Sequence, residues 1–98
     1  MRVELRSEAR DDLEEGAWFY EKQGGGLGDY FLDCIDTELA VLEVSFGIHG
    51  VVFGFHRKLV NRFPFAIYYR NADIFVDVVA ILDCRRDPAY IENRLRAT

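Results

Sequence analysis

The sequence predicts an α+β fold, in which a twisted antiparallel sheet with an N-terminal strand carries a helical hairpin on one face. Apolar residues recur at helical spacing over residues 7–22 and 29–45. After residue 45 the pattern changes to aromatic and β-branched runs of strand length. Because 98 residues suit one domain, we expect residues 1–98 to form a single domain of order β-α-α-β-β-β.

The first two elements are an expected strand and an expected helix. Residues 2–6 alternate polar and apolar side chains, which is the period of a half-buried strand. Ser7 is the expected N-cap of a helix that runs to Lys22. The apolar stripe of this helix consists of Ala9, Leu13, Ala17 and Tyr20. Residues 23–26 include three glycines, which end the helix.

A second amphipathic helix follows, with Asp29 as its expected N-cap. Its apolar residues are spaced by four, four and three positions, at Phe31, Ile35, Leu39 and Leu42. Acidic residues line the other faces, namely Asp33, Asp36, Glu38 and Glu43. We expect Cys34 to lie in the core. The short connection makes the two helices an antiparallel hairpin.

The second half of the chain predicts an antiparallel meander. Residues 51–60 are interpreted as strand, broken near His56 and Arg57. Residues 63–70 form the next expected strand, with Pro64 in its first residues or at a bulge. Residues 74–82 are almost all apolar, which predicts a central strand covered on both sides. Asp77 interrupts this run and needs a partner if buried, which an arginine of the same sheet would supply. Residues 90–96 are expected to form a short final helix.

Composition excludes several classes of protein. No apolar run approaches the ~18 residues that cross a bilayer, and the charged first residues are unlike a secretory signal. We therefore expect a cytoplasmic protein without a membrane partner. Cys34 and Cys84 are expected to be free thiols, since they lack metal-ligand spacing. The three glycines lack the Lys-Ser/Thr of a phosphate-binding loop. No cofactor and no metal are expected.

Charge is distributed unevenly along the chain. The net charge is −5, but residues 1–46 hold 4 Lys/Arg and 12 Asp/Glu, whereas residues 47–98 hold 8 and 5. The first half is therefore acidic and the second half mildly basic. A partner that binds one face meets the local charge rather than the average. The alternative is that two solvated helices are simply rich in acidic residues.

Four stretches of the sequence resemble the RelE/ParE superfamily of bacterial toxins. They lie in the family's order at residues 9–21, 26–39, 62–69 and 80–94. The Arg-Phe-Pro-Phe start of the third stretch and the Arg-Arg-Asp-Pro of the fourth resemble the ParE-type, plasmid-stabilisation branch. This resemblance implies a growth-inhibiting toxin of a type II toxin–antitoxin system. Such a toxin binds a cytoplasmic target such as DNA gyrase, without catalysis, and a cognate antitoxin neutralises it.

Two alternatives remain within the resemblance: a RelE-like endoribonuclease that cleaves mRNA on the ribosome, and an orphan or inactive member of the fold. Whether the protein is an enzyme stays open between them. For a ParE-like toxin, Arg85, Arg86 and Arg94 are the expected target-binding residues, because the guanidinium fork suits carboxylate or phosphate. They are alternatively structural, with Arg85 and Arg86 paired to Asp83, Asp87 or the acidic helices.

Cleavage of RNA needs a stabilised phosphate and groups that move protons. His56, Arg62 and Tyr90 are the candidate catalytic residues for that chemistry. The structural alternative makes His56 an ordinary strand histidine and Tyr90 a packing residue with a solvent-exposed hydroxyl. For the antitoxin, the acidic helices predict a contacting segment that carries Lys or Arg.

Overall fold

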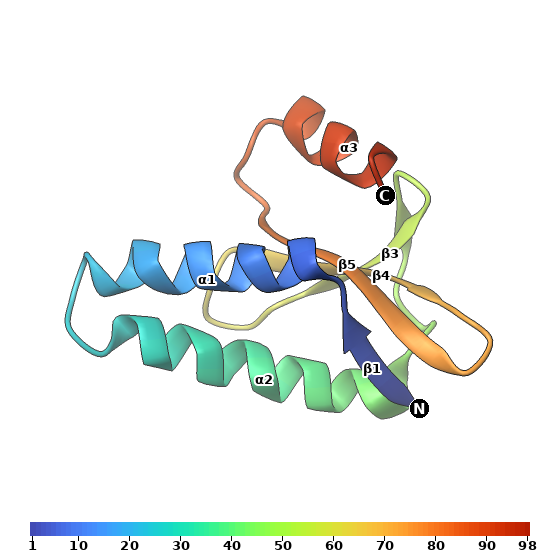
Figure 1. Cartoon of the computed structure of the whole chain (residues 1–98), viewed down its shortest axis with the longest axis horizontal. Helices are drawn as coiled ribbons and strands as arrows, with labels where there is room; N and C mark the ends of the chain where they lie inside the picture. Colours follow the sequence, from blue (N-terminus) through green and yellow to red (C-terminus); the bar gives the residue numbers. More distant parts are fainter.

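A five-stranded sheet separates two layers of helices in the computed structural model, which describes residues 1–98 (Figure 1). The elements in chain order are β1 (Arg2–Leu5), α1 (Ser7–Glu21), α2 (Leu27–Ser45), β2 (Val51–Val52), β3 (Phe55–Leu59), β4 (Phe65–Asn71), β5 (Phe75–Asp83) and α3 (Pro88–Arg96). The predicted α+β class and the helical hairpin on one face are confirmed.

The strand order is β1-β5-β4-β3-β2. Strands β2 to β5 form the expected antiparallel meander. The N-terminal strand pairs in parallel with β5, where Arg2 lies opposite Phe75, so the complete sheet is mixed. The intervening helical hairpin supplies the long connection that a parallel strand needs. The sequence pattern predicted that this strand pairs in the sheet, but not its direction.

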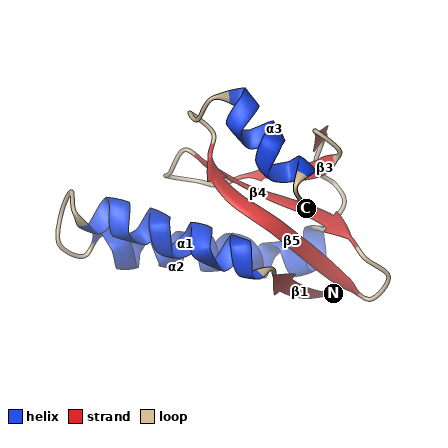
Figure 2. Cartoon of the chain, turned by 45° about the horizontal axis from the view of Figure 1, so that its top comes forward, coloured by secondary structure: helices blue, strands red, loops and turns tan.

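Strand β5 is the central strand, as predicted from its apolar run. It lies between β1 and β4, and residues 76–82 are all buried. Alternate side chains of β4 and β5 enter two separate cores. Ile67 and Ile81 face the α1–α2 hairpin, whereas Tyr68 and Leu82 belong to the core beneath α3. Figure 2 shows the strands running between the hairpin and α3.

The predicted cap of α1 is wrong. The helix begins at Ser7 itself, and Arg6 is its N-cap without a side-chain hydrogen bond. The Ser7 hydroxyl donates to the Glu8 carboxylate at 2.8 Å. Arg6 still donates its backbone N–H to Val78 of β5 at 3.0 Å. The chain therefore turns from strand to helix at Arg6 alone, and no side chain caps the helix start.

The predicted cap of α2 is also wrong, because Gly26 rather than Asp29 precedes the first helical turn. Gly26 has a φ of 88°, in the left-handed region that glycine adopts readily. The Glu21 carboxylate at the end of α1 accepts the backbone N–H of Gly26 and of Gly28, the latter at 3.0 Å. The preceding helix thus satisfies donors at the start of α2 that an N-cap side chain would otherwise take.

The predicted break at His56 and Arg57 is wrong as well. Both residues lie inside β3, and the chain reverses earlier, at Phe53 and Gly54. These two residues have φ values of 51° and 86°. Positive φ at both central residues is the geometry of a type I′ hairpin turn, which fits the twist of the flanking strands.

Three smaller differences concern boundaries and burial. Strand β4 begins at Phe65, after Pro64, whose carbonyl accepts the Cys84 N–H at 2.7 Å. Helix α3 begins at Pro88 and is capped by the Asp87 carboxylate. Cys34 is half-buried rather than a core residue, because it lies beside the apolar stripe of α2. None of the helices is both long enough and apolar enough to cross a membrane.

The predicted partner of Asp77 is confirmed and is in fact double. Asp77 is 5% exposed. Its carboxylate accepts from Arg6 Nη2 and from Arg70 Nε, each at 2.9 Å. Burial alone would raise the pKa of Asp77, but the two guanidinium groups hold it below its usual value. This arrangement ties the junction of β1 and α1 to β4 across the central strand.

Candidate functional site

A groove of about 330 Å³ lies between α1 and the end of β5. Its floor is apolar and includes Gly16, Phe65 and Leu82. Charged side chains also line the groove: Glu15, Lys22 and Arg86 are exposed, Asp83 is half-buried and Asp12 is buried. An apolar floor with a charged rim is the usual composition of a protein-binding surface.

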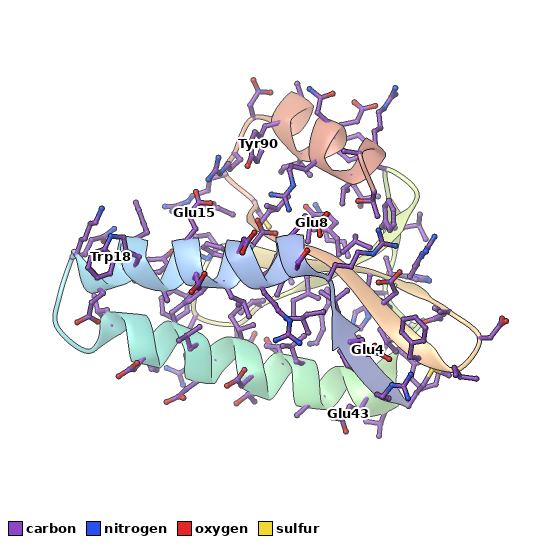
Figure 3. All side chains as sticks on the ribbon, in the orientation of Figure 1. Glu4, Glu8, Glu15, Trp18, Glu43 and Tyr90 are labelled. Atoms are coloured by element: carbon purple, nitrogen blue, oxygen red, sulfur yellow. The ribbon has the colours of Figure 1, made fainter.

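Two exposed aromatic residues near the end of α1, Trp18 and Phe19, also line this groove. Trp18 is 63% exposed and Phe19 is 49% exposed. Lys22 places its ammonium 5.5 Å from the centre of the Trp18 ring. Figure 3 shows Trp18 at the far end of α1, next to the turn that leads into α2. Large exposed aromatic side chains beside an apolar groove are typical of sites that bind a partner protein.

The outer side of the helical hairpin carries a second, shallower groove. It is lined by acidic residues of both helices, including Asp11, Glu14 and Asp29, and by Leu13 and Leu32. These three carboxylates make no ion pair within the chain. The groove therefore presents negative charge around an apolar strip, which suits a segment with both apolar and cationic side chains.

Arg85 and Arg86 lie in the loop between β5 and α3. Arg85 forks onto Asp83, with Nη2 donating to Oδ2 at 2.7 Å and Nε to Oδ1 at 3.0 Å. These bonds hold the pKa of Asp83 below its usual value. Arg86 donates to Glu15 of α1 at 3.0 Å, and its guanidinium lies 4.4 Å from the centre of the Tyr90 ring. Both arginines are exposed. Figure 3 shows Glu15 on the side of α1 that faces Tyr90.

Arg94 has different surroundings. It donates two hydrogen bonds to the buried Asp12 of α1, at 2.8 and 2.9 Å, and its side chain is 26% exposed. Asp12 also accepts the backbone N–H of Ile81 at 3.0 Å. The paired carboxylate raises the pKa of Arg94 above its already high value. Arg94 therefore links α3 to α1, while Arg85 and Arg86 remain at the surface.

The three candidate catalytic residues come from separate parts of the fold. The half-buried His56 stacks on Tyr69, a residue of the core beneath the hairpin, with ring centroids 5.0 Å apart. Arg62 lies in the β3–β4 connection with a φ of 74°. Tyr90 lies in the first turn of α3, over the opposite face of the sheet. The structure thus places His56 and Tyr90 on different faces.

A second histidine, His49, belongs to a small polar cluster with Tyr69. The Tyr69 hydroxyl accepts the Gly47 N–H at 2.9 Å and is hydrogen-bonded to Nδ1 of His49 at 2.5 Å. Burial, followed by the nearby charge of Lys58, lowers the pKa of His49. The sequence offered no signal for this cluster, because its members come from two segments about twenty residues apart. No group of three His, Cys, Asp or Glu side chains is arranged to hold a metal ion.

Comparison with known proteins gives one informative result. No protein-family profile and no curated protein matches the chain. Among solved structures, it resembles a chain described as "Chromosomal ParDE TA system from P. aeruginosa", with a TM-score of 0.67 and 19% sequence identity. The match covers 83% of this chain and 92% of that chain. This protein has a ParE-like fold.

Two buried charged pairs of this ParE-like fold were missed in the sequence. The sequence predicts Glu38 on a face other than the apolar stripe of its helix, but it is 7% exposed and accepts from Lys58 Nζ at 3.0 Å. It also accepts the Asn61 N–H at 2.8 Å. The signal was present in the spacing, since Glu38 lies three residues after Ile35 and four before Leu42, within the buried stripe. In the second pair, Asp12 with Arg94, the carboxylate of Asp12 is buried to a similar degree.

Proposed function

We propose that this protein is the toxin of a type II toxin–antitoxin system, a single domain over residues 1–98 that inhibits bacterial growth from the cytoplasm. The observation that carries the proposal is the fold shared with a chain of the ParDE system over most of both chains. The resemblance of residues 62–69 and 80–94 to the ParE-type, plasmid-stabilisation branch supports it from the sequence side.

The proposed mode of action is binding to a large cytoplasmic target such as DNA gyrase. Arg85 and Arg86 supply the surface for this contact. Both guanidinium groups are exposed and lie in one loop, and each is held by an acidic partner in the free protein. A target carboxylate can replace such a partner, because the planar fork binds any carboxylate in the same way. Arg94, the third residue predicted for this surface, contributes by fixing α3 against α1.

A cognate antitoxin is the proposed second partner. The groove beside α1, with Trp18 and Phe19 at its edge, accommodates apolar side chains of a segment that orders on binding. The acidic groove on the outer side of the hairpin favours Lys or Arg in the part of the antitoxin that crosses it. Apolar contacts supply affinity, and the charges select the partner.

Growth inhibition tests the target surface. The double variant Arg85→Ala/Arg86→Ala is expected to abolish growth inhibition while its circular dichroism spectrum stays native. Arg2→Ala is the matched control, because Arg2 is an exposed, ion-paired arginine on β1, away from this loop. Full toxicity of the double variant would remove these arginines from the proposal.

The purified protein distinguishes the modes of action. Inhibition of gyrase supercoiling supports the ParE-like proposal. Ribosome-dependent mRNA cleavage that is lost in His56→Ala or Tyr90→Phe would replace it by the RelE-like alternative. Absence of growth inhibition by the unmodified protein, with antitoxin binding retained, would identify an inactive member of the fold.

Co-purification tests the antitoxin surface. Trp18→Ser is expected to weaken capture of the protein encoded by the adjacent short reading frame while growth inhibition persists. Val44→Ser is the matched control, since Val44 is 83% exposed near the other end of the hairpin. Equal capture by both variants would move the antitoxin contact away from the groove.

A further inference from the structure

Tyr20 has an unusual hydroxyl. It is the only buried side-chain polar atom in the structure without a hydrogen-bond partner. The residue is 8% exposed, and its ring packs edge-on against Phe63 at 4.7 Å between ring centroids. Phe31 and Phe65 complete the surrounding aromatic cluster. A buried hydroxyl without a partner destabilises a protein, so its presence requires an explanation.

The residues that pack around Tyr20 adjoin the proposed target surface. Its ring centroid lies 6.1 Å from that of Phe65, and Phe65 is the cross-strand neighbour of Asp83. Asp83 points to the same face of the sheet as Phe65, because the two residues are paired directly. Burial raises the pKa of the Tyr20 hydroxyl, and the nearby charges of Arg85 and Asp83 shift that pKa in opposite directions. Tyr20 is thus the uncharged neighbour of the Asp83–Arg85 ion pair.

The hydrogen bonds of Asp83 show what changes if Arg85 leaves. Oδ1 accepts the backbone N–H of Arg85 at 2.8 Å as well as its side-chain Nε. Oδ2 accepts only from the Arg85 side chain, chiefly from Nη2 at 2.7 Å. Departure of the guanidinium therefore leaves Oδ1 bonded to the backbone and Oδ2 empty. The Asp83 side chain is 18% exposed, so water compensates for this loss only in part.

We propose that Tyr20, Asp83 and Arg85 form an exchange cluster, in which the Tyr20 hydroxyl donates to Asp83 Oδ2 whenever Arg85 turns outward to a carboxylate of the target. The inference rests on the proposed role of Arg85 in target binding. In the free protein the hydroxyl is unpaired. In the bound protein it replaces the guanidinium, so Arg85 is released without leaving a half-buried carboxylate oxygen unpaired. Tyr20 is then a positioning residue that acts through Asp83 and touches no target atom.

A double-mutant cycle tests the exchange on the protein alone, without any target. Tyr20→Phe is made in the unmodified chain and in Arg85→Ala, and the unfolding equilibrium constant is measured in urea. In the unmodified chain we expect Tyr20→Phe to leave this constant unchanged or to lower it, because an unpaired hydroxyl is removed. In Arg85→Ala, which imitates departure of the guanidinium, we expect it to raise the constant about tenfold.

The matched control for this cycle is Tyr30→Phe. Tyr30 belongs to the same aromatic cluster, 5.5 Å from Phe63 between centroids, but it is 41% exposed. Its hydroxyl should have the same small effect in both backgrounds. An effect of Tyr20→Phe that does not depend on Arg85 would overturn the exchange.

Target binding and growth inhibition then test the link to function. Tyr20→Phe is expected to weaken target binding by about tenfold while the protein becomes no less stable, a combination that a purely structural residue does not produce. Unchanged target binding by Tyr20→Phe, with Arg85→Ala inactive, would overturn the role of Tyr20. If Arg85→Ala itself remains fully toxic, the proposed target surface fails, and the stability cycle still decides the exchange independently.

Discussion

The hairpin side of the sheet buries a core cluster of 12 residues, whereas the side beneath α3 buries 7. The hairpin core is aromatic and contains Phe31, Phe65 and Tyr69, packed between two long helices and the sheet. On the other side, α3 contributes only Ile91 and Leu95. Since burial of apolar surface is the main stabilising term in folding, the hairpin layer holds the fold together, and α3 is the layer that can separate.

Ion pairs also contribute to how firmly each helical layer is attached to the rest of the fold. The ion pair between Arg94 and Asp12 connects α3 directly to α1, in addition to the apolar contacts of the small core. A second buried ion pair, Glu38 with Lys58, connects α2 to β3 inside the larger layer. Helix α3 therefore depends on one charged contact to a degree that α2 does not. Four predictions test this difference, beginning with the largest effect.

Phe31→Ala is expected to lower the free energy of unfolding by about 4 kcal/mol, because it leaves a cavity at the centre of the aromatic cluster. Urea unfolding followed by circular dichroism measures the loss. The whole domain should unfold in one transition at a lower urea concentration. A loss below about 1 kcal/mol, within the range of surface substitutions, would show that the hairpin core does not dominate stability.

Asp12→Asn is expected to cost about 3 kcal/mol, because Arg94 then lies partly buried without an opposing charge. The asparagine still offers an oxygen to the Ile81 N–H. Adding Arg94→Met should restore most of the lost stability, since the uncompensated charge is removed. If the double variant is no more stable than Asp12→Asn, the ion pair is not what joins α3 to α1.

Leu95→Ala is expected to cost about 2 kcal/mol and to act locally. Leu95 is 1% exposed, and its removal leaves Ile91 as the main apolar contact of α3. Hydrogen exchange should accelerate in α3 while β4 and β5 remain protected. Leu42→Ala, at a fully buried leucine of α2, is the matched control and should accelerate exchange throughout the hairpin layer. Uniform acceleration in both variants would make the two layers one cooperative unit.

The smallest effect concerns pH and belongs to the hairpin side. The folded protein binds a proton at His49 less readily than the unfolded chain does, because its pKa is lowered. The resulting stabilisation is complete above the ordinary histidine pKa of about 6.5 and is lost as pH falls below it. One proton changes stability by at most about 1.4 kcal/mol per pH unit, and the partial exposure of His49 reduces this. His49→Gln should flatten the decline between pH 6.5 and 5, as measured by thermal unfolding at each pH. An unchanged slope would assign the decline to other groups.

Much of this contrast was predictable from local pattern. The hairpin, the central β5 and the arginine partner of Asp77 follow from periodicity, an apolar run and the cost of burying an unpaired charge. The stripe of α1 was placed on Leu13 and Ala17, but Asp12 and Gly16 are more deeply buried. Apolar spacing alone misses this, because the partners of Asp12 are Arg94 and the Ile81 N–H, which lie about seventy or more residues away.

Helix starts were less predictable for a similar reason. Glu21 caps α2 from the preceding helix, so the residue types next to the helix start did not reveal it. The turn at Phe53 and Gly54 carried only one glycine as a signal, and Phe53 adopts a positive φ that its residue type does not favour. For the candidate site, the assignment of the arginine loop to target binding stays a prediction. The separation of Arg94 from that loop was not predictable from the sequence, because it depends on how α3 lies against α1.

The parallel pairing of β1 with β5 also determines when the chain can acquire its shape. During synthesis β1 leaves the ribosome before the other four strands, yet its only neighbour in the sheet is β5. The hydrogen bond from Arg6 to Asp77 spans 71 residues of sequence. Such non-local pairing raises contact order and slows folding. A nascent chain therefore has a formed helical hairpin but an unfinished sheet until β5 has emerged, and the arginine loop follows directly after that strand. The surface proposed to act on the target can therefore form only after β5 has been synthesised.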